Sequence, residues 1–406
     1  MTALDPWHRF VASCLRDAYF GRVRVTGEPL PEGDRPRLVI ASHRNGAIDG
    51  VQVQRAFPRA QHLVSLQLLR NPVLRVFFTG IPVVRRQDVE RYGMSPDRVS
   101  DPVGSGVRHL ADGGDLVVFP EGTSEWGHAP GRYQRGAARI WCALEEQCVE
   151  VDVIPVGLFY GAPDRFRSIA ELRVGPPVRL RDRGDAIDPG DERAAARARL
   201  GEAHEAMRAA LDAVSVRCPD PATFDAVQSA AVRRARSGES FASAFLVEQQ
   251  RVVEAQRRAI EAGGAVAARD QADPPAASAP SVSPSSWPRR IGLALMWLFA
   301  PVLLAGFAIG RRADARNTVT LFRMLGGGCA AALWIPAVVV IACFWPWPVL
   351  VGVAMAVAGW LLLGARRWHP DPEPLEASAA PDSTPAPTQP EIPTQTPTPT
   401  EGERHA

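Results

Sequence analysis

The chain has 406 residues and a formal net charge of +2, and all of its 46 basic residues are arginine. This near balance of charge argues against nucleic acid as the main partner, because binding to phosphate backbones favours a strong basic excess. The lack of lysine excludes chemistry that needs a primary amine, such as a Schiff base or a phosphate-loop lysine. The six cysteines show no spacing typical of a metal site, so we expect no metal and no cofactor.

The first part of the chain has the pattern of an α/β domain. Asp5, Arg9 and Arg16 interrupt the apolar residues at the N-terminus, which is not the pattern of a signal peptide, so we expect the soluble part to stay in the cytoplasm. Between residues 37 and 180, short β-rich runs alternate with helical patterns. The runs are RLVIAS, HLVSLQLL, IPVVRR, DLVVFPEG, VDVIPVGLFYG and ELRVGPPVRL.

Three further segments follow this domain. Asp188 and Pro189 are a cap and a first-turn proline for a helix through Ala213, which closes a domain over residues 1–216. Apolar residues at helical spacing predict a helical extension over 217–263. Residues 264–288, rich in Ala, Pro and Ser, and residues 368–406, rich in Pro and Thr, cannot bury a core. We expect a disordered linker and a disordered tail there.

The first candidate for chemistry is the segment from Ser42 to Gly50, which follows the strand-like run LVIA. Histidine is the side chain best suited to accept a proton near neutral pH, and a carboxylate on its other ring nitrogen fixes the tautomer and stabilises the imidazolium. His43 and Asp49 could form that pair. The same residues are also consistent with a histidine in a turn, followed by an aspartate that only caps a helix.

A second candidate follows the apolar run DLVVFP. Gly122 permits close approach of the backbone, and Glu121 with the following amides, at Thr123 and Ser124, could bind a substrate hydroxyl or polarise an oxyanion. A simple turn after a buried strand would explain these residues without chemistry.

Between these two segments, Arg85 and Arg86 follow the run IPVV. Arginine is the natural donor to a phosphate, although an exposed arginine pair is also typical of a solvated surface. A fourth run, VIPVG at residues 153–157, offers an apolar pocket wall.

In this order the four blocks, spanning roughly residues 20 to 180, resemble the phospholipid/glycerol acyltransferase family. The resemblance implies a mixed sheet flanked by helices and transfer of a fatty acyl group from acyl-CoA or acyl carrier protein to a hydroxyl of a glycerol phosphate. It also implies site roles, namely a general base at His43, its orienting carboxylate at Asp49, a phosphate ligand at Arg85 or Arg86, and acceptor contacts at Glu121 and Gly122.

The sequence departs from the commonest pattern of that family at two places. Five residues separate His43 from Asp49 where four are usual, and the third block ends in Ser124 where arginine is common. Both features look more like the branch that acylates glycerol 3-phosphate or dihydroxyacetone phosphate in phospholipid biosynthesis. A 1-acylglycerol-3-phosphate acyltransferase remains the alternative enzyme, and an inactive lipid-binding membrane scaffold is the alternative outside catalysis.

Residues 289–367 carry apolar runs of nearly bilayer length, at Ile291–Ile309, Leu325–Trp345 and Val349–Gly364. Helices buried in a large globule are the alternative. Arginines flank the runs, and positive residues prefer the cytoplasmic side. Three full spans would export the arginine-rich loop 311–323. A hairpin of the last two runs with a Trp-Pro tip outside, after a re-entrant first run bent at Pro301, would keep the loop and the catalytic domain on the cytoplasmic side, as expected for a bacterial inner membrane.

Overall fold

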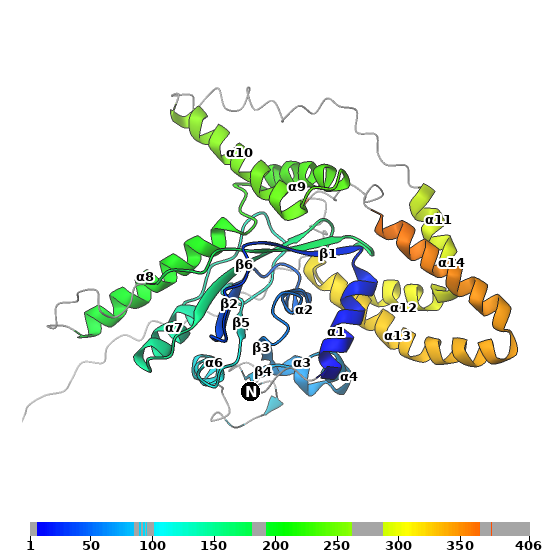
Figure 1. Cartoon of the computed structure of the whole chain (residues 1–406), viewed down its shortest axis with the longest axis horizontal. Coiled ribbons are helices and arrows are strands. Elements are labelled where there is room, and N and C mark those ends of the chain that lie inside the picture. Colours follow the sequence, from blue (N-terminus) through cyan, green and yellow to red (C-terminus); the bar gives the residue numbers. More distant parts are fainter. Residues whose placement is uncertain are drawn as a thin grey trace, which may run out of the picture.

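The computed structural model describes residues 6–84, 89–90, 92–93, 95, 101–180, 192–261, 287–365 and 375. They form an α/β domain, a helical hairpin and a C-terminal set of apolar helices (Figure 1). The strands are β1 (Arg22–Gly27), β2 (Arg37–Ala41), β3 (Gln61–Ser65), β4 (Ile81–Val83), β5 (Leu116–Val118), β6 (Asp152–Tyr160) and β7 (Ile169–Val174). The helices of the domain are α1 (Pro6–Tyr19), α2 (Ala47–Val53), α3 (Leu66–Arg70), α4 (Pro72–Phe77), α6 (Pro102–Ala111), α7 (Gly136–Glu146) and α8 (Glu192–Ala213).

The described strands make one seven-stranded sheet in the order β1-β7-β6-β2-β5-β3-β4. Each neighbouring pair is parallel except β6 and β7, which are antiparallel. The predicted fold class, a mixed sheet flanked by helices, is therefore confirmed.

Two elements differ from the sequence-based prediction. Strand β1 was missed because its sequence RVRVTG alternates valine with arginine, as suits an edge strand paired only with β7. The run HLVSLQLL was predicted as one strand, but β3 ends at Ser65 and Leu66–Arg70 forms α3. Leucine, glutamine and arginine favour helices, which explains the early end of this strand.

The core lies on both faces of the sheet, and strand β2 runs through its centre. Val39 and Ala41 pack with α1 and α2 on one face, whereas Leu38 and Ile40 pack with α6, α7 and α8 on the other. The period of two along a strand produces this division. Because both faces are covered, the C-terminal end of β2 is rigidly held, and the first candidate segment begins there.

Helices α9 (Pro221–Arg236) and α10 (Phe241–Glu261) form the predicted helical extension and pack against β6 and β7. Asp220 caps α9 by accepting from the Thr223 amide at 2.7 Å, and Pro221 occupies the first turn. Helix α8 ends at Ala213 as predicted, whereas its expected cap at Asp188 lies outside the described residues. The expected linker and tail also lie outside them, apart from residues 287–288, which begin the next helix, and Leu375.

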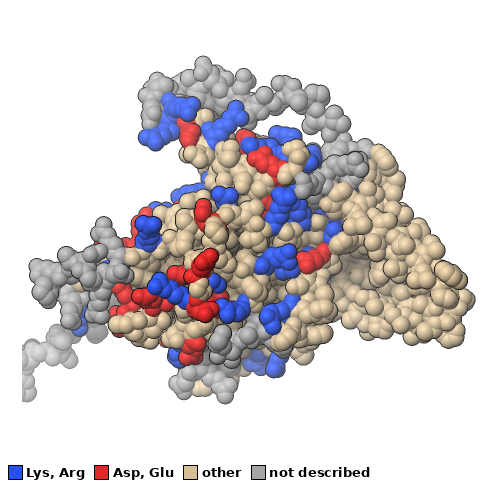
Figure 2. Space-filling model, viewed as in Figure 1, with Lys and Arg blue, Asp and Glu red and all other residues tan. Residues whose placement is uncertain are grey.

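The C-terminal set contains two helices long and apolar enough to cross a membrane, α13 (Arg316–Phe344) and α14 (Pro346–Gly364). Helices α11 (Trp287–Leu295) and α12 (Ala300–Gly310), joined by the short 3-10 helix η2 (Trp297–Phe299), form a pair bent by 67°. Figure 2 shows that the part of this set farthest from the sheet carries no charged residue on the visible face.

Two details of this set correct the prediction. The bend between α11 and α12 lies at Met296 and not at Pro301, which occupies the first turn of α12. A proline is tolerated there because the first-turn amides have no partner within the helix. The predicted Trp-Pro connector is also shorter, since Trp345 alone joins α13 to α14 and both prolines lie in the first turn of α14.

The apolar helices are held to the α/β domain at one end. On α13, the Thr320 hydroxyl donates to the Pro163 carbonyl, and the Arg323 guanidinium donates to the Asp164 carbonyl. On α14, the Trp360 indole donates to the Ala18 carbonyl at 3.2 Å. The bent pair starts where Arg289 contacts Phe166 of the domain, and it ends at Gly310, which packs on Arg323 of α13.

Candidate active site

The segment after β2 brings His43 and Asp49 together. Ser42 anchors its start, since its hydroxyl oxygen accepts from the Leu158 amide at 2.9 Å. Gly46 turns the chain with φ 56° and ψ −144°, a conformation open only to glycine, and α2 begins at the next residue. Asp49 therefore lies in the first turn of α2 and points back toward His43.

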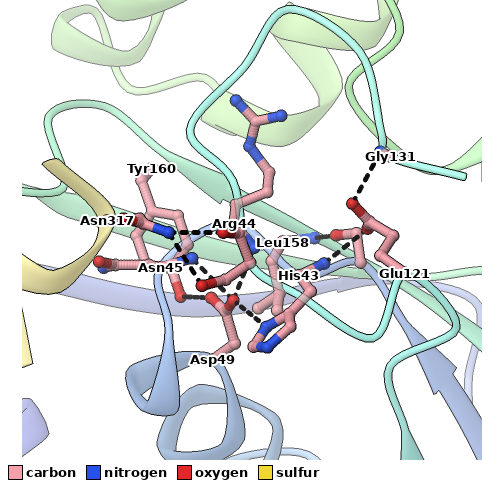
Figure 3. Close-up of polar contacts among 11 residues, drawn as sticks. His43, Arg44, Asn45, Asp49, Glu121, Gly131, Leu158, Tyr160 and Asn317 are labelled. Carbon is pink, nitrogen blue, oxygen red and sulfur yellow. Dashed lines mark hydrogen bonds and ion pairs between the residues drawn. The ribbon is translucent and has the colours of Figure 1, made fainter. Parts of the chain in front are cut away.

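The predicted pair is formed. His43 Nδ1 lies 2.9 Å from Asp49 Oδ2, and the carboxylate is fully buried while the imidazole is 17% exposed (Figure 3). A carboxylate on Nδ1 places the proton there, which leaves Nε2 as the nitrogen that can accept a proton. The ring also stacks on Phe119, with 4.3 Å between centroids and 20° between planes. The imidazole is thus fixed in tautomer and in orientation.

Asp49 is itself held by three further donors, which the sequence did not indicate. Its Oδ2 accepts from the backbone amides of Arg44 at 2.6 Å and Asn45 at 2.7 Å, and its Oδ1 accepts from the Tyr160 hydroxyl at 2.6 Å. Burial raises the pKa of Tyr160 well above its usual value, so this hydroxyl stays protonated as a donor. These three donors fix the position of the carboxylate beside the histidine.

Glu121 lies next to the His43–Asp49 pair but outside the cavity lining. Its Oε1 accepts from the His43 amide at 2.8 Å, and its Oε2 accepts from the Gly131 amide at 3.1 Å (Figure 3). Burial raises the pKa of Glu121, and donation by these two amides opposes that shift. We expected this carboxylate to contact the acceptor, whereas the structure shows it holding two backbone segments in place.

A cavity of about 650 Å³ borders the pair. His43, Gly122, Thr123 and Ser124 line its polar part, so three of the four residues predicted in the second block reach it. Gly122 has φ 73°, a left-handed conformation that favours glycine. Apolar side chains line the rest of the cavity, among them Val51, Leu63, Val64, Phe77, Phe78 and Val117. The lining of the cavity therefore combines polar groups with apolar side chains.

A second histidine in this cavity was not singled out from the sequence. His62 lies on β3, and burial lowers its pKa to about 4, so the ring is neutral at pH 7. Its Nε2 lies 3.3 Å from the amide nitrogen of Gln54, and among the described residues its buried Nδ1 has no hydrogen-bond partner. A histidine that stays neutral adds a polar group to the cavity without adding charge.

The arginines predicted to bind phosphate, Arg85 and Arg86, lie outside the described residues. Val83, two residues before them, lines the cavity. Arg44, next to His43, is buried and serves the fold, because its guanidinium lies 4.6 Å from the Trp126 ring and donates to the Gly127 carbonyl at 2.9 Å. Burial lowers the pKa of Arg44.

No protein-family model matches the sequence, and no curated protein matches it. Among solved structures, the crystal structure of the 1-acyl-sn-glycerophosphate (LPA) acyltransferase PlsC from Thermotoga maritima is similar, with 17% identity and a TM-score of 0.30. The match covers 50% of this chain and 81% of that chain. A likeness this low says nothing about chemistry, so we base the function on the geometry of the site.

Proposed function

We propose that the chain is an acyltransferase that moves a fatty acyl group from a thioester donor, acyl-CoA or acyl carrier protein, to a hydroxyl of glycerol 3-phosphate or dihydroxyacetone phosphate. The observation that carries this proposal is the buried Asp49 carboxylate on Nδ1 of His43, beside a cavity lined by both polar and apolar side chains. Such a pair makes a general base of the other ring nitrogen, and the apolar side chains suit an acyl chain.

In this reaction His43 Nε2 takes the proton from the acceptor hydroxyl while the oxygen attacks the thioester carbonyl. Asp49 stabilises the imidazolium that forms. The tetrahedral oxyanion then collapses, the carbon–sulfur bond breaks, and the leaving thiolate takes the proton from the imidazolium. An ester and a free thiol result, with no net change in charge. Groups of this kind contribute about 100- to 10,000-fold to a rate.

The phosphate of the acceptor requires a cationic ligand. Arg85 or Arg86 would supply it, because they follow β4 and the cavity-lining Val83. A guanidinium can bind a phosphate through two parallel hydrogen bonds.

We also propose that α13 and α14 cross a membrane as a hairpin, and that the bent pair α11–α12 enters and leaves it on the catalytic side. The start of the bent pair contacts the α/β domain, as does the arginine-bearing start of α13, and the end of the bent pair packs on Arg323 of α13. This arrangement keeps the arginines 311–323 beside the catalytic domain, on the cytoplasmic side that positive residues prefer, in a bacterial inner membrane.

The test is an assay of the purified full-length protein with labelled acyl-CoA, or acyl carrier protein, against glycerol 3-phosphate, dihydroxyacetone phosphate and 1-acylglycerol 3-phosphate. We expect transfer to one of the first two acceptors, and His43→Ala should lower the rate by about 100-fold or more. His128→Ala, a loop histidine outside the cavity lining, is the matched control and should stay near the wild-type rate. Transfer only to 1-acylglycerol 3-phosphate would show that the proposed acceptor is wrong. A folded His43→Ala protein that keeps a tenth of the wild-type rate would contradict the role of His43 as the general base.

A further inference from the structure

The first turn of α13 borders the catalytic cavity. Ala315, Asn317 and Thr318 of this turn line the cavity together with His43 and Ser124. They come from a helix that is long and apolar enough to cross a membrane, about 270 residues after the histidine in the sequence. One wall of the cavity is therefore built by the C-terminal helical set.

Asn317 makes the polar contacts of this wall. Its side-chain amide nitrogen donates to the Ser124 carbonyl at 2.6 Å and lies 2.9 Å from the Ser124 hydroxyl oxygen. The side chain is only 8% exposed. These part-buried hydrogen bonds tie Ser124 to α13.

The same loop is tied to the catalytic histidine on its other side. The Glu125 amide donates to the His43 carbonyl at 3.2 Å, and the Gly122 amide donates to the Phe119 carbonyl at 3.0 Å. The Asn317 backbone also packs closely against Gly46, because a Cβ atom added to this glycine would lie only 3.2 Å from the Asn317 carbonyl oxygen. Residues 122–125 are thus held between His43 and Asn317.

We propose that Asn317 is a positioning residue for the acceptor loop, residues 122–125, so that the candidate membrane helix α13 forms part of the acceptor site. The functional half of this inference rests on the acyltransferase function proposed above. Asn317 acts through Ser124 and its neighbours, which border the cavity, and it sets their distance from His43. Because the family resemblance assigns residues of this loop to the acceptor, we expect the effect to fall on acceptor binding.

Asn317→Asp tests the contact, because the variant keeps the size of the side chain but replaces the donating nitrogen with an oxygen that repels the Ser124 carbonyl. Thr320→Val is the matched control. It removes a hydrogen bond from the same helix to the Pro163 carbonyl, away from the cavity. Both variants are made in the full chain and assayed in detergent or bilayer discs. KM is measured for the acceptor at saturating donor, and then for the donor at saturating acceptor.

We expect Asn317→Asp to raise the acceptor KM about tenfold, which is the scale of one lost buried hydrogen bond with added repulsion, and to leave the donor KM within about twofold. Thr320→Val should leave both within about twofold. Equal changes in both constants, or the same change in both variants, would show that Asn317 only docks the helix and would overturn the proposal. Should Asn317→Asp fail to fold, Ser124→Ala removes the hydroxyl contact alone and should raise the acceptor KM by about threefold.

Hydrogen exchange gives a readout that does not depend on activity. In Asn317→Asp the amides of Gly122 and Glu125 should exchange several times faster than in the wild type, while Thr320→Val should leave them protected. Unchanged exchange at both amides would overturn the proposal. If the wild-type protein acylates none of the acceptors, the proposed function fails, and the exchange result still decides whether Asn317 holds the loop.

Discussion

Tyr160→Phe tests the network behind the catalytic pair. The Tyr160 hydroxyl donates to Asp49 Oδ1 at 2.6 Å, and both side chains are almost fully buried, at 1% and 0% exposure. The variant removes one oxygen atom and leaves the ring packed in the core, so the loss should come from the hydrogen bond. A hydrogen bond to a charged acceptor contributes about 1.5 to 3 kcal/mol to stability. A buried carboxylate oxygen that loses its donor is not resolvated, so most of this free energy should be lost in the variant.

We therefore expect Tyr160→Phe to lower the free energy of unfolding by about 2 kcal/mol. The rate should fall less than in His43→Ala, by about tenfold, because Asp49 keeps its Oδ2 contact with the histidine and two backbone donors. Denaturant unfolding in detergent and kcat/KM measure the two effects. Tyr19→Phe is a control, since the Tyr19 hydroxyl is buried in the same core but is not one of the groups that hydrogen-bond to Asp49. A Tyr160→Phe protein as stable and as active as the wild type would show that Tyr160 does not hold Asp49.

Two other results can be expected. Burial lowers the pKa of His62 from 6.5 to about 4. Between these two pH values His62 is protonated in the unfolded chain but neutral in the folded chain. Stability should fall as the pH falls through this window, by about 2 kcal/mol at pH 5, and His62→Gln should lack this part of the loss when unfolding is compared at pH 7 and pH 5. For the membrane arrangement, single cysteines replace Ala313 and Trp347 in a background without native cysteines, and intact cells are treated with an impermeant thiol reagent. We expect labelling at Trp347→Cys alone, and labelling at Ala313→Cys would rule out the proposed topology.

Contacts that are local in the sequence were the ones that could be predicted. His43 and Asp49 lie six residues apart, so a strand end, a glycine turn and a helix start suffice to bring them together. Tyr160 lies 111 residues from Asp49 and Asn317 lies 193 residues from Ser124, and only the assembled fold places them side by side. A sequence carries no periodic or spacing signal for such pairs.

The alternation of short apolar runs predicted most of the sheet because buried parallel strands are apolar on both faces. This pattern did not predict β1, because the arginines of this edge strand interrupt its apolar residues. The role of Glu121 could not be predicted either. Its position after β5 was right, but the direction of its carboxylate depends on the amides of Gly131, ten residues away, and of His43, 78 residues away in the chain.

If α13 crosses a membrane as proposed, the place where it leaves the α/β domain sets the depth of the cavity relative to lipid. Met324 of this helix is buried in the same core cluster as the central strands. The helix continues to Phe344, and about 20 residues at 1.5 Å each cover about 30 Å, the thickness of a hydrocarbon core. Asn317 lies two turns before Met324, so the cavity would open at the level of the lipid head groups. A phosphate would meet the enzyme there from the water side, and an acyl chain could pass into the bilayer without crossing water.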